Sequence, residues 1–271
     1  MTIHLRSLQV IKIRPWPDKF PFNVPIFSGL DELVFTSPVT FLVGENGSGK
    51  STILEALACA AGSITVGSAE TRRDDTLKPV RELAKDLKLV WSKRTRKGFF
   101  MRSEDFFGFA RRVDQTRAGL QEDLRQVDED YKGRSEYARG LAQMAYRREL
   151  GDLDSRYGEG VDSRSHGESY LNLFQSRFIP GGLYLLDEPE APLSPKRQLS
   201  FLVLLKQMID QDGQFIIATH SPILMGFPGA VILSCDTGRL EKVNYQDLEH
   251  VFITRGFLEN PQIYLRELGL L

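Results

Sequence analysis

The sequence predicts an α/β fold, because short apolar runs alternate with longer stretches that have the spacing of helices. Three runs, at residues 39–43, 183–187 and 214–218, consist mostly of apolar residues, as is typical of strands buried inside a sheet. Each run is followed by a turn rich in glycine or polar residues and then by a helical pattern. Residues 3–13 instead alternate apolar and polar side chains, which predicts an edge strand in an N-terminal antiparallel part.

The first apolar run leads directly into a glycine-rich loop, Gly44-Glu45-Asn46-Gly47-Ser48-Gly49-Lys50-Ser51-Thr52, and a helical pattern follows over residues 53–58. Glycines let such a backbone wrap so that successive N–H groups point at a phosphate, and the helix start adds the positive end of its dipole. A glycine-rich surface turn has a similar composition, but the strand before it and the helix after it favour a phosphate-binding loop. The sequence therefore predicts a protein that binds a nucleoside triphosphate.

Several residues of this loop have expected roles around the triphosphate and its Mg²⁺. Lys50 is expected to reach the β- and γ-phosphates, and the Ser51 hydroxyl is expected to bind Mg²⁺. The residues expected to surround the nucleotide are Gly44, Asn46, Gly47, Ser48, Gly49, Lys50, Ser51 and Thr52.

Two acidic residues, Asp187 and Glu188, end the second apolar run. Asp187 at the tip of that strand would hold Mg²⁺ opposite Ser51, and Glu188 would polarise the attacking water. Paired acids after a strand can also form a solvated turn. The phosphate-binding loop upstream favours the catalytic interpretation.

His220 follows the third apolar run. A histidine at a strand end is usually structural, but this one is expected at the same sheet edge as Asp187, where an imidazole can contact the γ-phosphate and the water. Upstream, Ser165-His166-Gly167-Glu168-Ser169 precedes a helical pattern, as an anion-binding helix start would. An ordinary capped helix has the same pattern.

The composition is that of a soluble globular protein, with 271 residues, 41% hydrophobic and 26% charged. The net charge of −1 gives no overall preference for nucleic acid or membrane. No apolar run can span a membrane, and residues 1–10 lack the apolar centre of a signal peptide, so we expect a cytoplasmic protein without membrane insertion of its own. Cys59 and Cys235 lack metal-site spacing and are expected to be reduced, buried thiols.

The middle of the chain is rich in charge and in helical spacing. Residues 70–97 have an excess of Lys and Arg, which could bind nucleic-acid phosphates, although such runs are more often solvated faces. Residues 98–101 predict a strand, and residues 102–104 a loop at its tip. Residues 111–148 predict a compact helical arm, interrupted at Gly133 and Gly140 and without a heptad repeat. A flexible stretch is expected over residues 151–162.

Five motifs occur in one order, namely GENGSGKST, SHGES, LYLLDEPE, APLSP and ATHSP. This order resembles the ATPase heads of the ABC superfamily, where the motifs are Walker A, signature, Walker B, D-loop and switch histidine. The resemblance covers about residues 3–245. With the segment 98–104, the motifs look like those of small stand-alone ATPases related to DNA-repair and chromosome-structure (SMC-like) ATPases.

The resemblance implies a single P-loop NTPase domain of the ABC-ATPase type over residues 1–271. Its mixed sheet core would have an N-terminal antiparallel β part and a helical subdomain inserted over residues 102–178. It also implies hydrolysis of ATP with Mg²⁺ and an ATP-dependent head-to-tail homodimer, in which Ser165, Gly167 and Ser169 of one subunit complete the other's site. Asp187 would then be the Mg²⁺ acid, Glu188 the general base and His220 the γ-phosphate switch.

Two departures from the ABC pattern bear on these roles. SHGES replaces the LSGGQ that is typical of transporters, and the Q-loop glutamine is missing near residues 101–105, where Glu104 could substitute.

Three functions are compatible with the motifs. The first is a soluble ATPase that moves a protein or nucleic-acid partner, the second is the ATP-binding subunit of a membrane ABC transporter, and the third is a switch that barely hydrolyses ATP. The atypical signature, the missing glutamine and the helical stretch over residues 101–166 argue against a transporter, and Glu188 argues against a switch. The absence of long coiled-coil arms argues against a chromosome-structure protein itself. We therefore predict the soluble ATPase.

Overall fold

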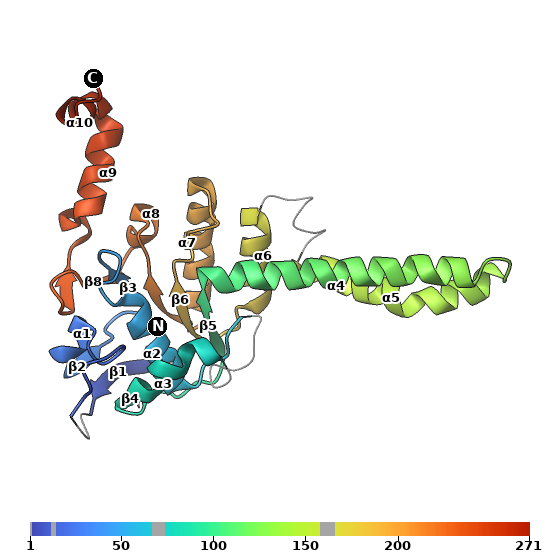
Figure 1. The fold of residues 1–271 in the computed structure, drawn as a ribbon, viewed down its shortest axis with the longest axis horizontal. Coiled ribbons are helices and arrows are strands. Elements are labelled where there is room, and N and C mark those ends of the chain that lie inside the picture. Colours follow the sequence, from blue (N-terminus) through green and yellow to red (C-terminus); the bar gives the residue numbers. More distant parts are fainter. Residues whose placement is uncertain (1, 12–14, 67–73, 158–165) are drawn as a thin grey trace.

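A computed structural model describes residues 2–11, 15–66, 74–157 and 166–271 (Figure 1). Its centre is a six-stranded sheet in the order β5-β6-β7-β3-β8-β9. The strands are β3 (Val39–Val43), β5 (Gly98–Arg102), β6 (Leu183–Asp187), β7 (Gln214–Ala218), β8 (Val231–Ser234) and β9 (Glu241–Val243). Neighbouring strands from β5 to β8 are parallel, and β9 is antiparallel to β8. The predicted α/β fold with a mixed sheet is confirmed.

A second, three-stranded antiparallel sheet has the order β2-β1-β4, with β1 at Leu5–Val10, β2 at Glu32–Val34 and β4 at Leu87–Trp91. The antiparallel N-terminal part was expected, but the prediction of an edge strand is wrong, because β1 is the middle strand. Alternation along a strand indicates one buried face and says nothing about how many neighbours it has. The two neighbours come from segments far along the chain.

The two faces of the large sheet are covered by different elements, because successive side chains of a strand point to opposite faces. On one face, Tyr184 and Leu186 pack with α6 (His166–Arg177) and α7 (Pro195–Asp210). On the other face, Leu185 packs in a cluster with α2 (Lys50–Ala61), α3 (Lys78–Ala84) and the small sheet. Both faces of these strands are buried, which explains why their sequences are continuously apolar.

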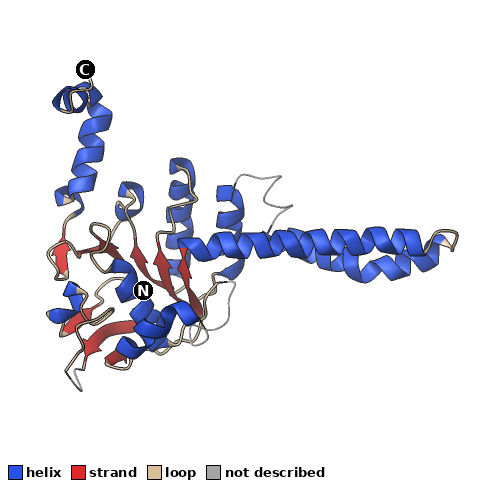
Figure 2. Cartoon of the chain, in the orientation of Figure 1, coloured by secondary structure: helices blue, strands red, loops and turns tan. Residues whose placement is uncertain are grey.

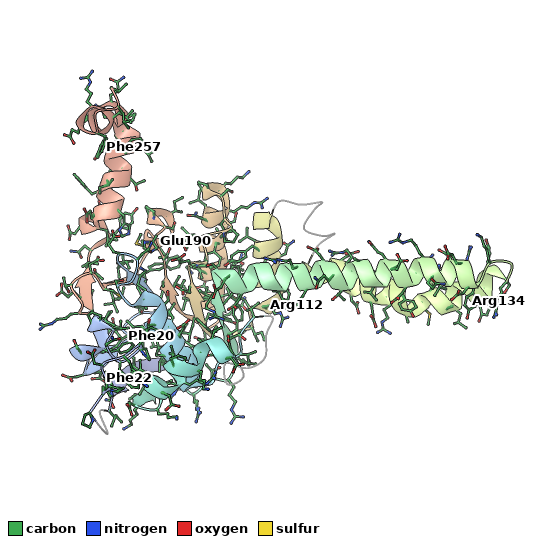
Figure 3. All side chains as sticks on the ribbon, viewed as in Figure 1. Phe20, Phe22, Arg112, Arg134, Glu190 and Phe257 are labelled. Carbon is green, nitrogen blue, oxygen red and sulfur yellow. The ribbon has the colours of Figure 1, made fainter. Side chains whose placement is uncertain are left out.

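Two long helices, α4 (Ser103–Asp130) and α5 (Glu136–Tyr157), lie side by side and project from the body as an arm (Figure 1). Arg134 lies at the tip of the arm (Figure 3). Arg117 of α4 contacts Asp154 of α5 at 3.0 Å, so the two helices are joined by polar as well as apolar contacts. α4 alone is about 42 Å long at 1.5 Å per residue.

The prediction of a compact arm is therefore wrong, and so is that of a loop over residues 102–104. The Arg102 N–H donates to the Asp105 side chain, so the helix starts as soon as β5 ends. Gly133 lies in the turn between the helices as an interruption, but Gly140 lies inside α5. An exposed glycine costs a helix only about 1 kcal/mol, which the arm tolerates.

The helical subdomain expected over residues 102–178 contains α4, α5 and α6, and its status as a subdomain stays a prediction. α5 continues to Tyr157, so the first part of the stretch expected to be flexible is helical. The remainder of that stretch, residues 158–162, lies outside the described residues.

The chain ends in a second projection, made of α9 (Glu249–Glu259) and α10 (Pro261–Glu267), on which Phe257 lies (Figure 3). Figure 2 shows that both projections consist of helix, whereas the strands lie in the body. The remaining helices are short: α1 (Pro25–Ser28), α8 (Pro222–Met225) and the 3-10 turns at Asp75–Leu77 and Tyr245–Asp247. Across the described ranges, no helix is both long and apolar enough to cross a membrane.

Both cysteines are free thiols, as expected. Cys235 is buried in the core, whereas Cys59 is only partly buried, so the expectation of burial holds fully for one of them.

We expect Gly98→Ala to destabilise the protein strongly. Gly98 has a φ of +106°, and a Cβ there would collide with the Leu183 carbonyl group of the neighbouring strand. Gly133 has a similar φ of +87° but nothing within 4 Å of its Cβ position, so Gly133→Ala is the matched control. Urea unfolding should show a loss of about 1 to 2 kcal/mol for the control and at least about 3 kcal/mol for Gly98→Ala. Equal losses would contradict the assigned packing of β5 on β6.

Candidate nucleotide-binding site

The glycine-rich loop connects β3 to α2 and lies at the carboxyl edge of the large sheet. Gly44 and Gly49 adopt φ values of +137° and +102°, a region that other residues rarely occupy. A Cβ at Gly49 would lie 2.8 Å from the Val24 side chain, so this position also lacks room. Gly44, Asn46, Gly47 and Ser48 thus lie in the loop, Gly49 caps α2, and the following three residues begin the helix.

Lys50 closes the loop on itself. Its ammonium group donates to the carbonyl oxygens of Gly44 at 2.7 Å and Glu45 at 2.9 Å, and the residue is 5% exposed. The Ser48 hydroxyl is buried and has no hydrogen bond within the described part of the chain. A buried cation and an unsatisfied hydroxyl therefore border a loop whose backbone can bind an anion.

Asp236, just after β8, fixes the other side of the loop. Its Oδ1 accepts from the Glu45 N–H at 2.7 Å, and its Oδ2 accepts from the Ser234 hydroxyl at 2.8 Å. No sequence motif singled out this residue. It joins the loop only because β8 pairs with β3 in the sheet.

Asp187, the last residue of β6, lies beside the start of α2 and accepts a hydrogen bond from the Ser51 side chain. Burial raises the pKa of Asp187 to about 6, and the Ser51 hydrogen bond opposes this rise. Its Oδ1 is buried without a hydrogen bond to any described residue. An unsatisfied carboxylate oxygen next to a hydroxyl is a donor set that suits a hard cation such as Mg²⁺.

Glu188 follows in a sharp turn with a φ of +48°, which is unusual for a residue other than glycine. Its N–H donates to the Ala218 carbonyl oxygen at 2.9 Å, which holds the turn against β7. The side chain is 42% exposed, and its Oε1 lies 3.9 Å from Nε2 of His220. The structure therefore brings together Glu188 and His220, which lie 32 positions apart in the sequence.

Glu190 is a residue whose contribution the sequence-based reasoning missed (Figure 3). Its Oε1 accepts from the backbone N–H of His220 at 2.7 Å, and its side chain also bonds with the Thr219 side chain. Burial raises its pKa, and these hydrogen bonds oppose the rise. The third carboxylate of the run Asp187-Glu188-Pro189-Glu190 was the available signal.

The residues expected to act across a dimer are described only in part. Gly167 and Ser169 lie in the first turn of α6, which packs against α5 and α7, and their side chains are outside the described set. Ser165 lies outside the described residues altogether. Their role in a second subunit stays a prediction.

Arg102, whose side chain is 13% exposed, occupies the end of β5 where a Q-loop glutamine was expected. Its guanidinium group forms ion pairs with Asp74 at 2.9 Å, Asp105 at 3.2 Å and Glu55 at 3.7 Å. Glu104, proposed from the sequence as a substitute, is 74% exposed and also pairs with Arg102, at 3.4 Å. Residue type alone gave no indication of this cluster, because its members come from three separate segments, at residues 55, 74 and 102–105.

Two segments of the chain match models of known protein families. A family model described as "AAA domain" matches residues 22–132, and one described as "AAA domain, putative AbiEii toxin, Type IV TA system" matches residues 173–226. The two matches lie on either side of the signature segment and cover the phosphate-binding loop, Asp187, Glu188 and His220. Both descriptions name an AAA domain, so the family models support the predicted likeness to AAA-type ATPases over these two segments.

Individual ABC-type relatives are distant. The chain is 24% identical over 248 residues to the energy-coupling factor transporter ATP-binding protein EcfA2 of Streptococcus sanguinis (strain SK36), covering 90% of this chain and 82% of the relative.

Two solved structures match nearly the full chain. An Smc head domain with an extended coiled coil, bound to the C-terminal domain of ScpA, from Pyrococcus furiosus, is 11% identical, with 96% of this chain and 99% of that chain covered and a TM-score of 0.45. A nucleotide-free ATP-binding cassette from an ABC transporter is 15% identical, with 96% and 98% covered and a TM-score of 0.48. Because both TM-scores are below 0.5, the fold assignment rests on the sheet order and the loop geometry described above.

We expect Glu55→Gln to change how the stability of this protein depends on pH. Burial raises the pKa of Glu55 from 4.5 to about 7, with Arg102 opposing the rise. The folded state therefore retains a proton that the unfolded state loses, so this group stabilises the fold at low pH and its contribution falls as pH rises from about 4.5 to 7. Relative to wild type, the variant should gain about 3 kcal/mol over this range in urea unfolding, because one pKa unit corresponds to about 1.4 kcal/mol.

The exposed Glu122 on the arm provides the control for this measurement, since Glu122→Gln removes a carboxylate that is 65% exposed. Its pH dependence should match that of wild type. If the free energy of unfolding of Glu55→Gln had the same pH dependence as that of wild type, protonation of Glu55 would not contribute to it.

Proposed function

We propose that this protein binds and hydrolyses MgATP, and that ATP drives two copies into a head-to-tail dimer that acts on a protein or nucleic-acid client. The observation that carries the proposal is the convergence of three strand ends. Lys50 and Ser51 follow β3, Asp187 and Glu188 end β6, and His220 follows β7, all at one edge of the sheet.

The phosphate-binding part of the proposal rests on Lys50 and the loop. Lys50 is a buried cation that the loop holds by two carbonyl groups, so it is positioned before a triphosphate binds. Backbone N–H groups of the loop and the start of α2 would bind the β-phosphate. The Ser48 hydroxyl, buried and unsatisfied, is available to a phosphate oxygen.

Ser51 and Asp187 would hold Mg²⁺. The bound cation would supply a positive charge that neutralises the phosphate oxygens during transfer of the γ-phosphoryl group. Burial raises the pKa of Asp187 to about 6. The positive charge of Lys50 opposes this rise, and a bound Mg²⁺ would favour the carboxylate form further. Asp187 is therefore expected to be a carboxylate at neutral pH when Mg²⁺ is bound.

Glu188 is proposed as the general base and His220 as the group that contacts the γ-phosphate. Glu188 is partly exposed, so its carboxylate can reach a water molecule, while its backbone is held against β7. Glu190 would position His220 through the bond to its N–H group and is not expected to touch the nucleotide.

The dimer is proposed because the order of the five motifs resembles that of ABC-type ATPase heads, in which the signature of one subunit completes the site of the other. Ser165, Gly167 and Ser169 of a second copy would complete it. In this proposal α6 lies at the base of the arm, so ATP binding would also draw the arms of two copies together.

The transporter alternative has one specific observation in its favour. The relative in Streptococcus sanguinis is named as a transporter ATP-binding protein, and the match covers most of both chains. On this reading α4 and α5 would contact a separate membrane subunit. Co-purification with membranes would favour the alternative, and full recovery in the soluble fraction would favour the first proposal.

We expect Glu188→Gln to retain ATP binding, to reduce turnover by about 10²- to 10⁴-fold and to trap a dimer. The amide cannot accept the proton of the attacking water, so ATP bound between two subunits would persist. Turnover should be measured by phosphate release, and mass by light scattering with and without MgATP.

Glu122→Gln, on the arm and away from the sheet edge, should retain wild-type turnover and mass. Normal turnover of Glu188→Gln would rule out Glu188 as the base. A monomer that nonetheless binds ATP would mean that another chain supplies the second half of the site.

A further inference from the structure

The loop that joins β4 to β5 carries four cationic side chains, Lys93, Arg94, Arg96 and Lys97, and all four are exposed. It lies at the amino edge of the large sheet, because Gly98 starts β5 and pairs there with Leu183, the first residue of β6. The carboxyl edge, with Asp187, is four residues further along the strand, or roughly 13 Å away. The loop is therefore separate from the candidate nucleotide site.

The backbone of this basic loop is fixed by hydrogen bonds. The Thr95 hydroxyl donates to the Gly181 carbonyl oxygen at 2.9 Å and accepts from the Lys97 N–H at 3.1 Å. The Leu183 N–H donates to the Lys97 carbonyl oxygen at 3.0 Å. Because the loop is ordered before any ligand binds, a ligand pays only for the side chains that it immobilises.

Three of the four cations border a recess of about 370 Å³. Its wall is formed by Arg94, Arg96 and Lys97 on one side, by Trp91 at the end of β4, and by residues 61–64 at the end of α2. No acidic residue of the described ranges lines it. A recess of this size accommodates a nucleotide, and its cations favour an anionic one.

A simpler role for the cations would be to neutralise the negative end of α2, which borders the recess. That helix end is already capped by its own backbone. Gly62 adopts the left-handed conformation and its N–H donates to the carbonyl oxygens of Ala58 and Cys59, while the Ser63 N–H donates to Ala58. The helix end therefore needs little further compensation.

We propose that this recess binds the phosphodiester backbone of a single-stranded nucleic acid, with a base against Trp91. A guanidinium group can donate two hydrogen bonds to phosphate oxygens, and an indole ring offers a surface on which an unpaired base can stack. A recess of about 370 Å³ that is lined by the end of α2, Trp91 and the basic loop admits one strand more readily than a duplex or a flat membrane surface. The inference deepens the proposed function by naming the class of client, but binding at the recess does not require ATP hydrolysis.

The test measures binding of a fluorescein-labelled oligo-dT by fluorescence anisotropy without nucleotide. The variant Arg94→Ala/Arg96→Ala/Lys97→Ala should bind at least about tenfold more weakly than wild type, and its salt dependence should be shallower by about two in log–log slope. The charge-matched variant Lys206→Ala/Lys242→Ala/Arg266→Ala, with exposed cations elsewhere, should bind as wild type does. Equal weakening of both variants, or of neither, would overturn the proposal.

A second measurement follows the fluorescence of Trp91, which borders the recess. The chain has two tryptophans, so Trp16→Phe leaves Trp91 as the remaining indole, and oligo-dT should quench its emission. Unchanged emission at saturating oligo-dT would overturn the placement of the strand. Binding of anionic phospholipid vesicles that depends on the three cations, without binding of oligo-dT, would overturn the nucleic-acid assignment in favour of a membrane.

Binding of a fluorescent ATP analogue by the triple variant separates this proposal from the ATPase proposal. The variant should bind the analogue as wild type does, because the recess lies at the opposite edge of the sheet. Loss of both ligands would indicate unfolding, and the single variants Arg94→Ala and Arg96→Ala, each expected to weaken oligo-dT binding by several-fold, then decide the matter.

Discussion

The register of the parallel strands is the constraint on which the candidate site depends. Asp187 pairs with Ala218, and Ala218 pairs with Leu42, so the ends of β6, β7 and β3 are level with one another. A shift of one residue in any pair would turn these side chains to the other face of the sheet. The continuous burial of the strands on both faces opposes such a shift, so the core and the site are maintained by the same packing.

Arg102 connects this edge to the rest of the molecule. It pairs in register with Asp187 and forms ion pairs with α2 through Glu55, with the segment before α3 through Asp74 and with the first turn of α4 through Asp105. Burial is the main cause of the raised pKa of Glu55; the carboxylates of Asp187, Glu104 and Asp74 add to the rise, and Arg102 opposes it. The start of the arm and the helix of the phosphate-binding loop therefore share one electrostatic cluster.

Local patterns predicted the strands and the phosphate-binding loop well, because burial on both faces and the glycine positions act over a few residues. They failed where distant segments decide the outcome. β1 is central because β2 and β4 both reach it. Asp236 and Glu190 gain their contacts only once strands far apart in the chain are paired, and Arg102 reaches Glu55 and Asp74 only in the folded chain. The interruption expected at Gly140 is absent, because α5 packs along α4 and a helix held by a neighbouring helix tolerates one glycine.

The length of the arm has a mechanical consequence. α4 is anchored at one end, where Arg102 and Asp105 hold its first turn, and its far end lies beside α5 and the turn around Arg134 (Figure 3). A rigid rod of about 42 Å that tilts by about 5° at its base displaces its tip by about 4 Å. Rearrangements at the sheet edge that are too small to alter the core would thus be amplified into a stroke large enough to move a bound macromolecule.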